Sequence, residues 1–205
     1  MNRRNRRNLA RLALACAMAL CGAARTEVPA VHYADGQALI RYGGMTVLVD
    51  PAEQGGPLPP VDLVLLRGCG PAVRGWLERQ QLDRAVVVLA DGACAAELRG
   101  LGVRRIQLLR LWSAYVLRKE RASLRLTVMP GAVAAQPPEL GGLGALLDLS
   151  NGESAPCRIY VGGEAGEDDV RALPERFPGA DLAIVRRGGQ PLTLRLSPPM
   201  PRTRR

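Results

Sequence analysis

The chain has 205 residues, 47% of them hydrophobic, which suits one domain of ordinary size. Its net charge of +9 falls to +4 when the five arginines among the first eleven residues are left out, so the body is close to neutral. This balance excludes the basic groove expected of a nucleic-acid-binding protein. Aromatic residues make up only 3%, so the core must consist mainly of Leu, Val, Ala and Ile.

The first 24 residues have the three-part layout of a signal peptide. Arginines precede a short apolar run at residues 12–20, and the small residues at 22–24 suit a signal peptidase. The run is too short to span a bilayer as a stable helix. We therefore predict an export signal at residues 1–24, which would place the protein in the periplasm. The pair Arg6-Arg7 also fits a twin-arginine signal, and a disordered basic arm is the alternative.

The first half of residues 25–197, the predicted domain, alternates short apolar runs with helical patterns. Runs at 38–42 and 45–50 around Gly43-Gly44 predict a β-hairpin. Buried strands at 61–66 and 85–89 alternate with helices at 71–81 and 93–101, and a strand follows at 103–108.

The second half predicts a further set of strands around one helix. The strands are expected at 114–117, 124–129, 145–149, 158–161, 181–185 and 192–196. The helix is expected at 167–177, with a kink or restart at Pro174. Two such α/β halves suit two packed sheets with helices outside. We expect Leu65, Val87, Val128 and Ile159 to be buried, and both tryptophans to lie in the core. Residues 198–205 are predicted to form a disordered basic tail.

Five segments, in this order, resemble the metallo-β-lactamase superfamily, and within it the branch of L-ascorbate-6-phosphate lactonase-like proteins. They read ALIRYGGMTVLVDPA, PPVDLVLLRGCGPAVRGWL, LRLTVMPGAV, GALLDLSNGESAPCRIYVGGEAG and VRALPERFPGADLAIVRRGG. The resemblance runs from residue 31 to about residue 194. It implies a four-layer αββα sandwich of two mixed β-sheets. It also implies two zinc or manganese ions at one edge of the sandwich, called here the mouth.

The family's metal ligands are missing from the matching positions. The family's metal loop reads Thr-His-x-His-x-Asp-His, the third histidine follows a later strand, and the bridging aspartate follows a hairpin. These ligand positions are occupied here by Gly68, Gly70, Ala72, Val73, Val133 and Glu164. The late histidine would fall near Gln190. The only histidine of the chain, His32, lies outside these positions, and imidazoles are the main ligands of such sites. We therefore assign no metal and no catalytic residue.

A different site could be built at the mouth from Asp50, Cys69 and Glu164. Sites for Mg²⁺ or Ca²⁺ need several carboxylate or carbonyl oxygens. The alternative, which we favour, is that Glu164 and the acids after it form the acidic start of a helix. The glycines beside Glu164 could form an anion nest, although the family's Gly-Asp turn explains them better. Cys69 is expected to lie near Cys94, because both follow predicted neighbouring strands.

The sequence thus predicts an exported protein with a metallo-β-lactamase-like fold that has lost its dinuclear metal site. Its function would be non-catalytic binding of a protein partner or a small ligand at the mouth, with no metal cofactor. The alternative is a metal-dependent hydrolase of lactone or phosphoester type with an atypical or single-metal site. No transmembrane span is expected.

Overall fold

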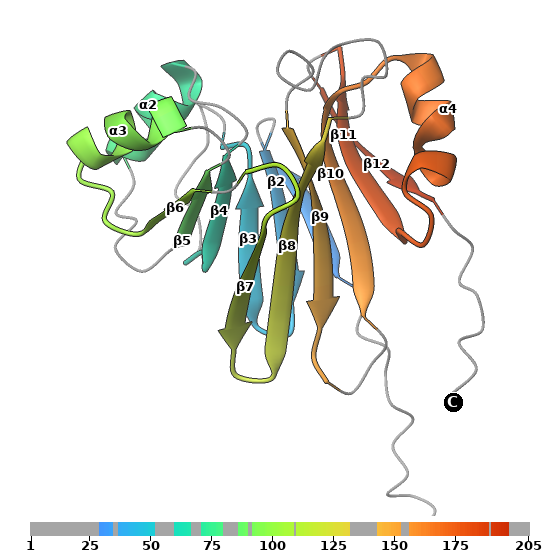
Figure 1. Ribbon diagram of the computed structural model, residues 1–205, viewed down its shortest axis with the longest axis horizontal. Coiled ribbons are helices and arrows are strands. Elements are labelled where there is room, and N and C mark those ends of the chain that lie inside the picture. The colour runs from blue at the N-terminus through green and yellow to red at the C-terminus, as the bar shows by residue number, and fades with distance from the viewer. Residues whose placement is uncertain are drawn as a thin grey trace, which may run out of the picture.

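The structure, a computed structural model, describes residues 29–34, 37–51, 60–66, 71–79, 86–89, 92–108, 110–131, 143–152, 156–188 and 190–196. Two six-stranded β-sheets pack face to face (Figure 1). The N-terminal sheet consists of β1 (Ala30–Ala34), β2 (Gln37–Tyr42), β3 (Met45–Val49), β4 (Leu63–Leu66), β5 (Val86–Leu89) and β6 (Ile106–Leu108), in this order. The first three strands are antiparallel and the pairs from β3 to β6 are parallel.

The C-terminal sheet has the order β12-β11-β10-β9-β8-β7. Its strands are β7 (Ala114–Lys119), β8 (Ala122–Pro130), β9 (Leu143–Ser150), β10 (Cys157–Glu164), β11 (Leu182–Arg187) and β12 (Gln190–Arg195). Only the pair β10–β11 is parallel. Both sheets are therefore mixed, as predicted. A two-residue turn, Glu120-Arg121, joins β7 to β8.

The main core lies between the two sheets and is built from alternate residues of the facing strands. Side chains such as Val47 and Leu63 from one sheet meet Leu124, Leu147 and Ile159 from the other, and all five are at most 1% exposed. The alternation of buried and exposed residues along β8 is the period-two pattern that a strand with one buried face requires.

Helices cover the outer faces of the sheets unequally. Helices α2 (Pro71–Arg79) and α3 (Gly92–Gly100) lie against the N-terminal sheet, where Trp76 and Leu98 pack with Leu48 (Figure 1). Helix α4 (Glu167–Arg176) covers the C-terminal sheet near β10–β12, where Leu173 packs with Tyr160. The described helices thus supply both outer layers of the predicted αββα sandwich, the second one over part of its sheet.

Most of the predicted elements are confirmed, with four differences. Strand β1 was not predicted, and β6 is shorter than the expected strand at 103–108. Helix α4 continues past Pro174 without a restart and ends two residues later, at Arg176. Leu65, Val128 and Ile159 are buried as expected, whereas the side chain of Val87 and residues 1–24 and 198–205 lie outside the described residues.

The fourth difference is Trp112, which was expected in the core and is 66% exposed. Trp76, by contrast, is 1% exposed and lies in the core. Trp112 lies in the connection between the two sheets, where its backbone has a positive φ of 65° and its side chain has no sheet to pack against. None of the helices in the described part of the chain is long and apolar enough to cross a membrane.

Candidate functional site

A cleft opens between the sheets at the edge where β3, β10 and β11 end, which is the mouth expected from the family resemblance. Its empty volume is about 240 Å³, including space that is open to solvent. Six apolar residues and the backbone of Gly162 form most of its wall: Ala38, Val49, Val161, Ile184, Val185 and Pro191. Two charged side chains, Asp50 and Arg186, complete it. Only about 10 Å³ of this space can be occupied by water, which is room for about one water molecule and far below the roughly 300–1,000 Å³ of a usual small-molecule site.

Asp50 reaches the cleft because it ends β3 in an unusual backbone conformation. Its φ is 47°, in the left-handed region that Asp and Asn adopt more readily than other non-glycine residues. Its backbone N–H donates to the Leu65 carbonyl oxygen at 3.2 Å, which holds it beside the end of β4. Asp50 is half-buried and is followed by the buried Pro51. The Asp-Pro that the sequence singled out therefore lies at the mouth.

Arg186 enters the cleft from β11, and an irregularity in the neighbouring strand sets its position. The pairing of β10 with β11 shifts between Val161 and Glu164, so that Glu164 lies in register with Arg186. The Ala165 N–H then donates to the Arg186 carbonyl oxygen at 2.8 Å. Such a bulge re-aims the side chains at the end of a strand. It leaves Glu164 exposed at the rim and Arg186 half-buried in the wall.

The glycine at the start of this bulge is required by packing. A Cβ added to Gly162 would lie 2.7 Å from the Tyr160 ring, and one added to Gly144 would lie 2.8 Å from its hydroxyl. The ring is fully buried, stacks on Phe177 at a centroid distance of 3.7 Å, and donates its O–H to the Pro130 carbonyl oxygen at 3.3 Å. The need for glycine at 162 thus comes from Tyr160, which the sequence analysis did not connect with it.

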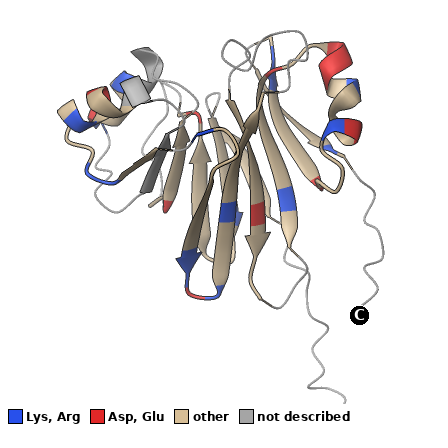
Figure 2. Cartoon of the chain, viewed as in Figure 1, with Lys and Arg blue, Asp and Glu red and all other residues tan. Residues whose placement is uncertain are grey.

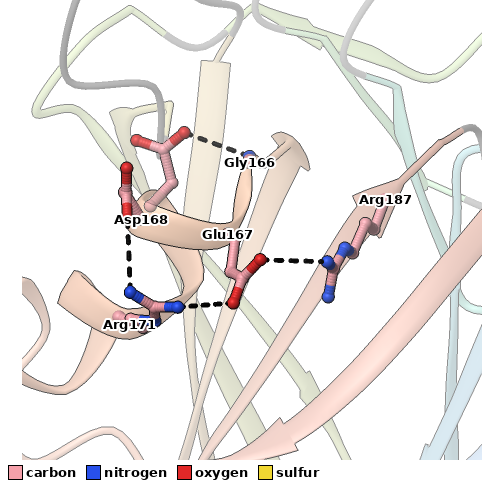
Figure 3. Close-up of polar contacts among 6 residues, drawn as sticks. Gly166, Glu167, Asp168, Arg171 and Arg187 are labelled. Carbon is pink, nitrogen blue, oxygen red and sulfur yellow. Dashed lines mark hydrogen bonds and ion pairs between the residues drawn. The ribbon is translucent and has the colours of Figure 1, made fainter.

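The acidic residues after Glu164 are engaged with the helix that they begin. Asp169 accepts a hydrogen bond from the Gly166 N–H at 3.1 Å, which caps α4 (Figure 3). Glu167 pairs with Arg171 at 2.5 Å and with Arg187 at 3.7 Å. Three acids in the first turn suit the positive end of the helix dipole and would repel a bound anion. This arrangement supports the helix-start interpretation over both a carboxylate metal site and an anion nest.

The structure brings only part of the candidate set together. Asp50 lines the cleft, and Glu164 is exposed at the end of β10, in register with Arg186 of the wall. Gly68, Cys69, Gly70 and Val133, and the side chains of Ala72, Val73 and Cys94, lie outside the described residues. The predicted clustering of these positions near Glu164 therefore stays a prediction, as does the approach of Cys69 to Cys94. Gln190, the position of the late histidine, begins β12 and is exposed.

The residues at the family's ligand positions do not fit a dinuclear metal site. Five of the six are Gly, Ala or Val, whose side chains have no donor atom. A guanidinium, which carries a permanent positive charge and only donates hydrogen bonds, lines the same cleft at Arg186. Within the described part of the chain, no three His, Cys, Asp or Glu side chains are grouped closely enough to hold a metal ion. No catalytic step through a metal is therefore derived.

Comparisons with known proteins relate the chain to solved structures only. No model of a known protein family matches it, and no curated protein does either. An isothiocyanate hydrolase from Delia radicum gut bacteria is similar with a TM-score of 0.50 and 17% identity, over 76% of this chain and 70% of that one. A possible metal-dependent hydrolase from Veillonella parvula has a TM-score of 0.44 and 12% identity, over 77% and 70% of the two chains.

A subclass B3 metallo-β-lactamase from a soil metagenome library, MEM-A1, has a TM-score of 0.43 and 14% identity, over 73% and 72% of the two chains. The likeness to the isothiocyanate hydrolase, together with the two mixed sheets and their flanking helices, supports the architecture. The chain has a metallo-β-lactamase fold. At these identities the similarity concerns the fold alone, and the lactonase-like branch stays a prediction.

Arg186 is the residue of this site that the sequence analysis missed. Arg187, the next residue, is exposed at the end of the same strand, whereas Arg186 is half-buried and lines the cleft. The only signal in the sequence was its position at the end of a strand beside the Gly-Gly-Glu turn, since the family's mouth lies where these strands end.

Proposed function

We propose that this chain is a metallo-β-lactamase-fold protein that no longer carries the dinuclear metal site, and that it acts by binding a partner at the former mouth. The observation that carries the proposal is the loss of donor atoms at five of the six ligand positions, in a chain with one histidine. His32 lies on β1 and is exposed, and it does not line the cleft.

The charges at the cleft support the same proposal. In the metal-dependent hydrolases, two divalent cations bind and activate the attacking water. Here the fixed charges in the wall are one carboxylate, Asp50, and one guanidinium, Arg186. A permanent cation at this place opposes the binding of a second cation in the same small volume. Asp50 supplies the only carboxylate of the described wall.

The character of the cleft indicates what it would hold. Its wall is largely apolar, and its two opposite charges suit a small contact such as one side chain of a partner protein. The volume is below the usual range for a small-molecule site. A protein partner that covers this edge therefore fits better than a free ligand of drug-like size.

Hydrolysis assays test the loss of activity. Purified protein is offered lactone and phosphoester substrates in three parallel samples: untreated, treated with a chelator, and supplied with zinc or manganese. A metallo-β-lactamase of known activity is the control for the metal and chelator treatments. We expect no turnover above buffer in any sample. Turnover that the chelator abolishes and added metal restores would contradict the proposal and support the atypical-site hydrolase.

Export is the second part of the proposal, supported by the signal-peptide layout of residues 1–24. Mass spectrometry of the protein from its native host measures the N-terminus of the mature chain. We expect residues 1–24 to be absent from protein recovered in the periplasmic fraction. An intact N-terminus on cytoplasmic protein would contradict export without affecting the proposed loss of the metal site.

A further inference from the structure

The two sheets end in four edge strands, and β7 is the one best suited to accept another strand. Strand β6 has only three residues, and β12 contains Pro191, which removes a backbone donor. Strand β1 faces β12 across the sandwich, where the hydroxyls of Tyr33 and Thr193 are hydrogen-bonded. Strand β7 has six residues and no proline, and it ends the C-terminal sheet at the side opposite to β12. Proteins usually protect exposed edges of this kind.

The hydrogen bonds of β7 show which of its backbone groups point away from the sheet. The Val128 N–H donates to the Ser113 carbonyl oxygen at 3.0 Å, so residue 113 faces β8. Backbone groups alternate in direction along an antiparallel strand. Those of Ala114, Val116 and Arg118 therefore point outward. The side chains of the same three residues are exposed, and Val116 is 50% exposed.

Trp112 lies at the beginning of this edge and is held in a strained conformation. Its N–H donates to the Val128 carbonyl oxygen at 2.9 Å, and with the Ser113 bond this forms a β-bulge whose first residue has positive φ. Glycine is the usual residue at that position. The turn before it is fixed by Ser113, whose Oγ accepts from the Arg110 N–H at 2.8 Å. A rigid turn thus presents a tryptophan to solvent at a cost in backbone strain, a pattern that indicates function.

The surroundings of this edge are apolar and strongly basic. Of the six exposed large hydrophobic residues in the described part of the chain, four lie between positions 108 and 116: Leu108, Leu111, Trp112 and Val116. Residues 101–131 contain one acid, Glu120, and seven basic residues: Arg104, Arg105, Arg110, Arg118, Lys119, Arg121 and Arg125. All the arginines of this segment are exposed, and Figure 2 shows basic positions at the β6 end and along β7 and β8. Lys119 is paired with Asp62 at 2.9 Å.

We propose that the β7 edge binds an extended acidic segment of a partner protein, which adds a strand to the C-terminal sheet. Main-chain hydrogen bonds to residues 114, 116 and 118 would give affinity, as in known cases of strand addition. The exposed tryptophan would anchor the segment, and the arginines would select acidic side chains. A second copy of this chain would bring two basic surfaces together, and their repulsion disfavours self-association. In the C-terminal sheet, β8 and β9 separate β7 from the cleft strands β10 and β11. The proposal is therefore independent of the proposed function.

Selection from a displayed library of random dodecapeptides on the full chain tests the proposal. We expect enriched peptides that are acidic, lack a central proline and bind less tightly as salt is added. Two variants of one residue separate backbone pairing from side-chain contact. Val116→Pro removes an outward N–H that β8 does not use, and Val116→Ala keeps it. Val116→Pro should weaken binding at least about tenfold more than Val116→Ala.

Trp112→Gly gives a second, opposite pair of effects. The substitution relieves the backbone strain at residue 112, where a positive φ favours glycine, so the melting temperature of the variant should rise. Peptide binding should fall about tenfold or more, because the anchoring side chain is lost. Hydrogen exchange of the complex should show new protection at residues 114, 116 and 118, alternating with residues already protected in the free chain.

Four outcomes would overturn the proposal. The first is that no peptide is enriched. The second is that selected peptides bind Val116→Pro and the parent chain equally. The third is that the parent chain self-associates and Val116→Pro abolishes this. The fourth is binding to vesicles of phosphatidylcholine and phosphatidylglycerol that Val116→Pro leaves unchanged, which would assign the surface to lipid.

Discussion

Replacing Gly162 with alanine tests how closely the mouth is packed. The new Cβ would lie 2.7 Å from Tyr160 Cε1 and 3.0 Å from its hydroxyl oxygen, closer than ordinary contacts allow. The ring cannot move aside easily, because it is fully buried between Gly144, Gly162 and Phe177. Forcing an extra carbon into such a site costs about 1–3 kcal/mol. Gly162 is not among the glycines with positive φ, so the loss would come from the contact and not from backbone strain.

Urea denaturation followed by circular dichroism measures this loss, and for a chain of this size the melting temperature should fall by about 2–12 °C. Gly100→Ala is the matched control, since no atom lies within 4 Å of its added Cβ and its position at the end of α3 favours alanine. In the Tyr160→Leu background the cost of Gly162→Ala should shrink by about 0.5 kcal/mol or more. The reasoning fails if Gly162→Ala leaves stability unchanged, or if its cost is the same with and without the tyrosine ring.

Three further predictions concern the turns and edges of the sandwich. Glu120 has a positive φ of 53° in the β7–β8 turn, so Glu120→Gly should leave stability unchanged or raise it by up to about 1 kcal/mol, and a clear loss in denaturation would contradict this. Asp62 accepts bonds from the Thr46 N–H at 2.8 Å and from Lys119 at 3.0 Å. Asp62→Ala should therefore destabilise more than Lys119→Met, because it also removes the acceptor of a backbone donor; the reverse order in urea would refute the explanation. Tyr33 is partly exposed, and the burial of the rest of its side chain raises its pKa from the ordinary value of 10.0, partly offset by its hydrogen bond with Thr193. A raised folded pKa means that stability is lost as pH rises above 10, so Tyr33→Phe should reduce the alkaline loss of stability, and an unchanged pH profile would contradict this.

The strongly apolar strands were predictable from sequence, whereas the marginal ones were not. The run at 61–66 contains β4, and all four residues of that strand are buried, so its apolar composition alone identified it. Strand β1 was missed because Ala30, His32 and Tyr33 are exposed and, among its described side chains, only Val31 packs against the core, which leaves too weak an alternation to recognise. Trp112 was misplaced because its exposure depends on the bulge opposite Val128, a pairing between residues that no local pattern shows.

The position of the mouth followed from the order of the segments, but its contents did not. Asp50 was identified because an Asp-Pro after an apolar strand is visible in one segment. Arg186 was not, because its entry into the cleft depends on the bulge in β10 that sets its register with Glu164. The reason for Gly162 was also hidden, since it depends on how the Tyr160 ring lies across two neighbouring strands.

The metal content of the purified chain tests the central claim most directly. Elemental analysis after dialysis, together with a zinc titration, measures how many ions each chain retains. A variant that carries Gly68→His, Gly70→His, Ala72→Asp and Val73→His restores the family's loop and serves as the matched control for detection. The loss of donor atoms predicts substoichiometric metal in the parent chain and tighter zinc binding in the restored variant. Stoichiometric zinc or manganese that the parent chain retains through dialysis would contradict the claim.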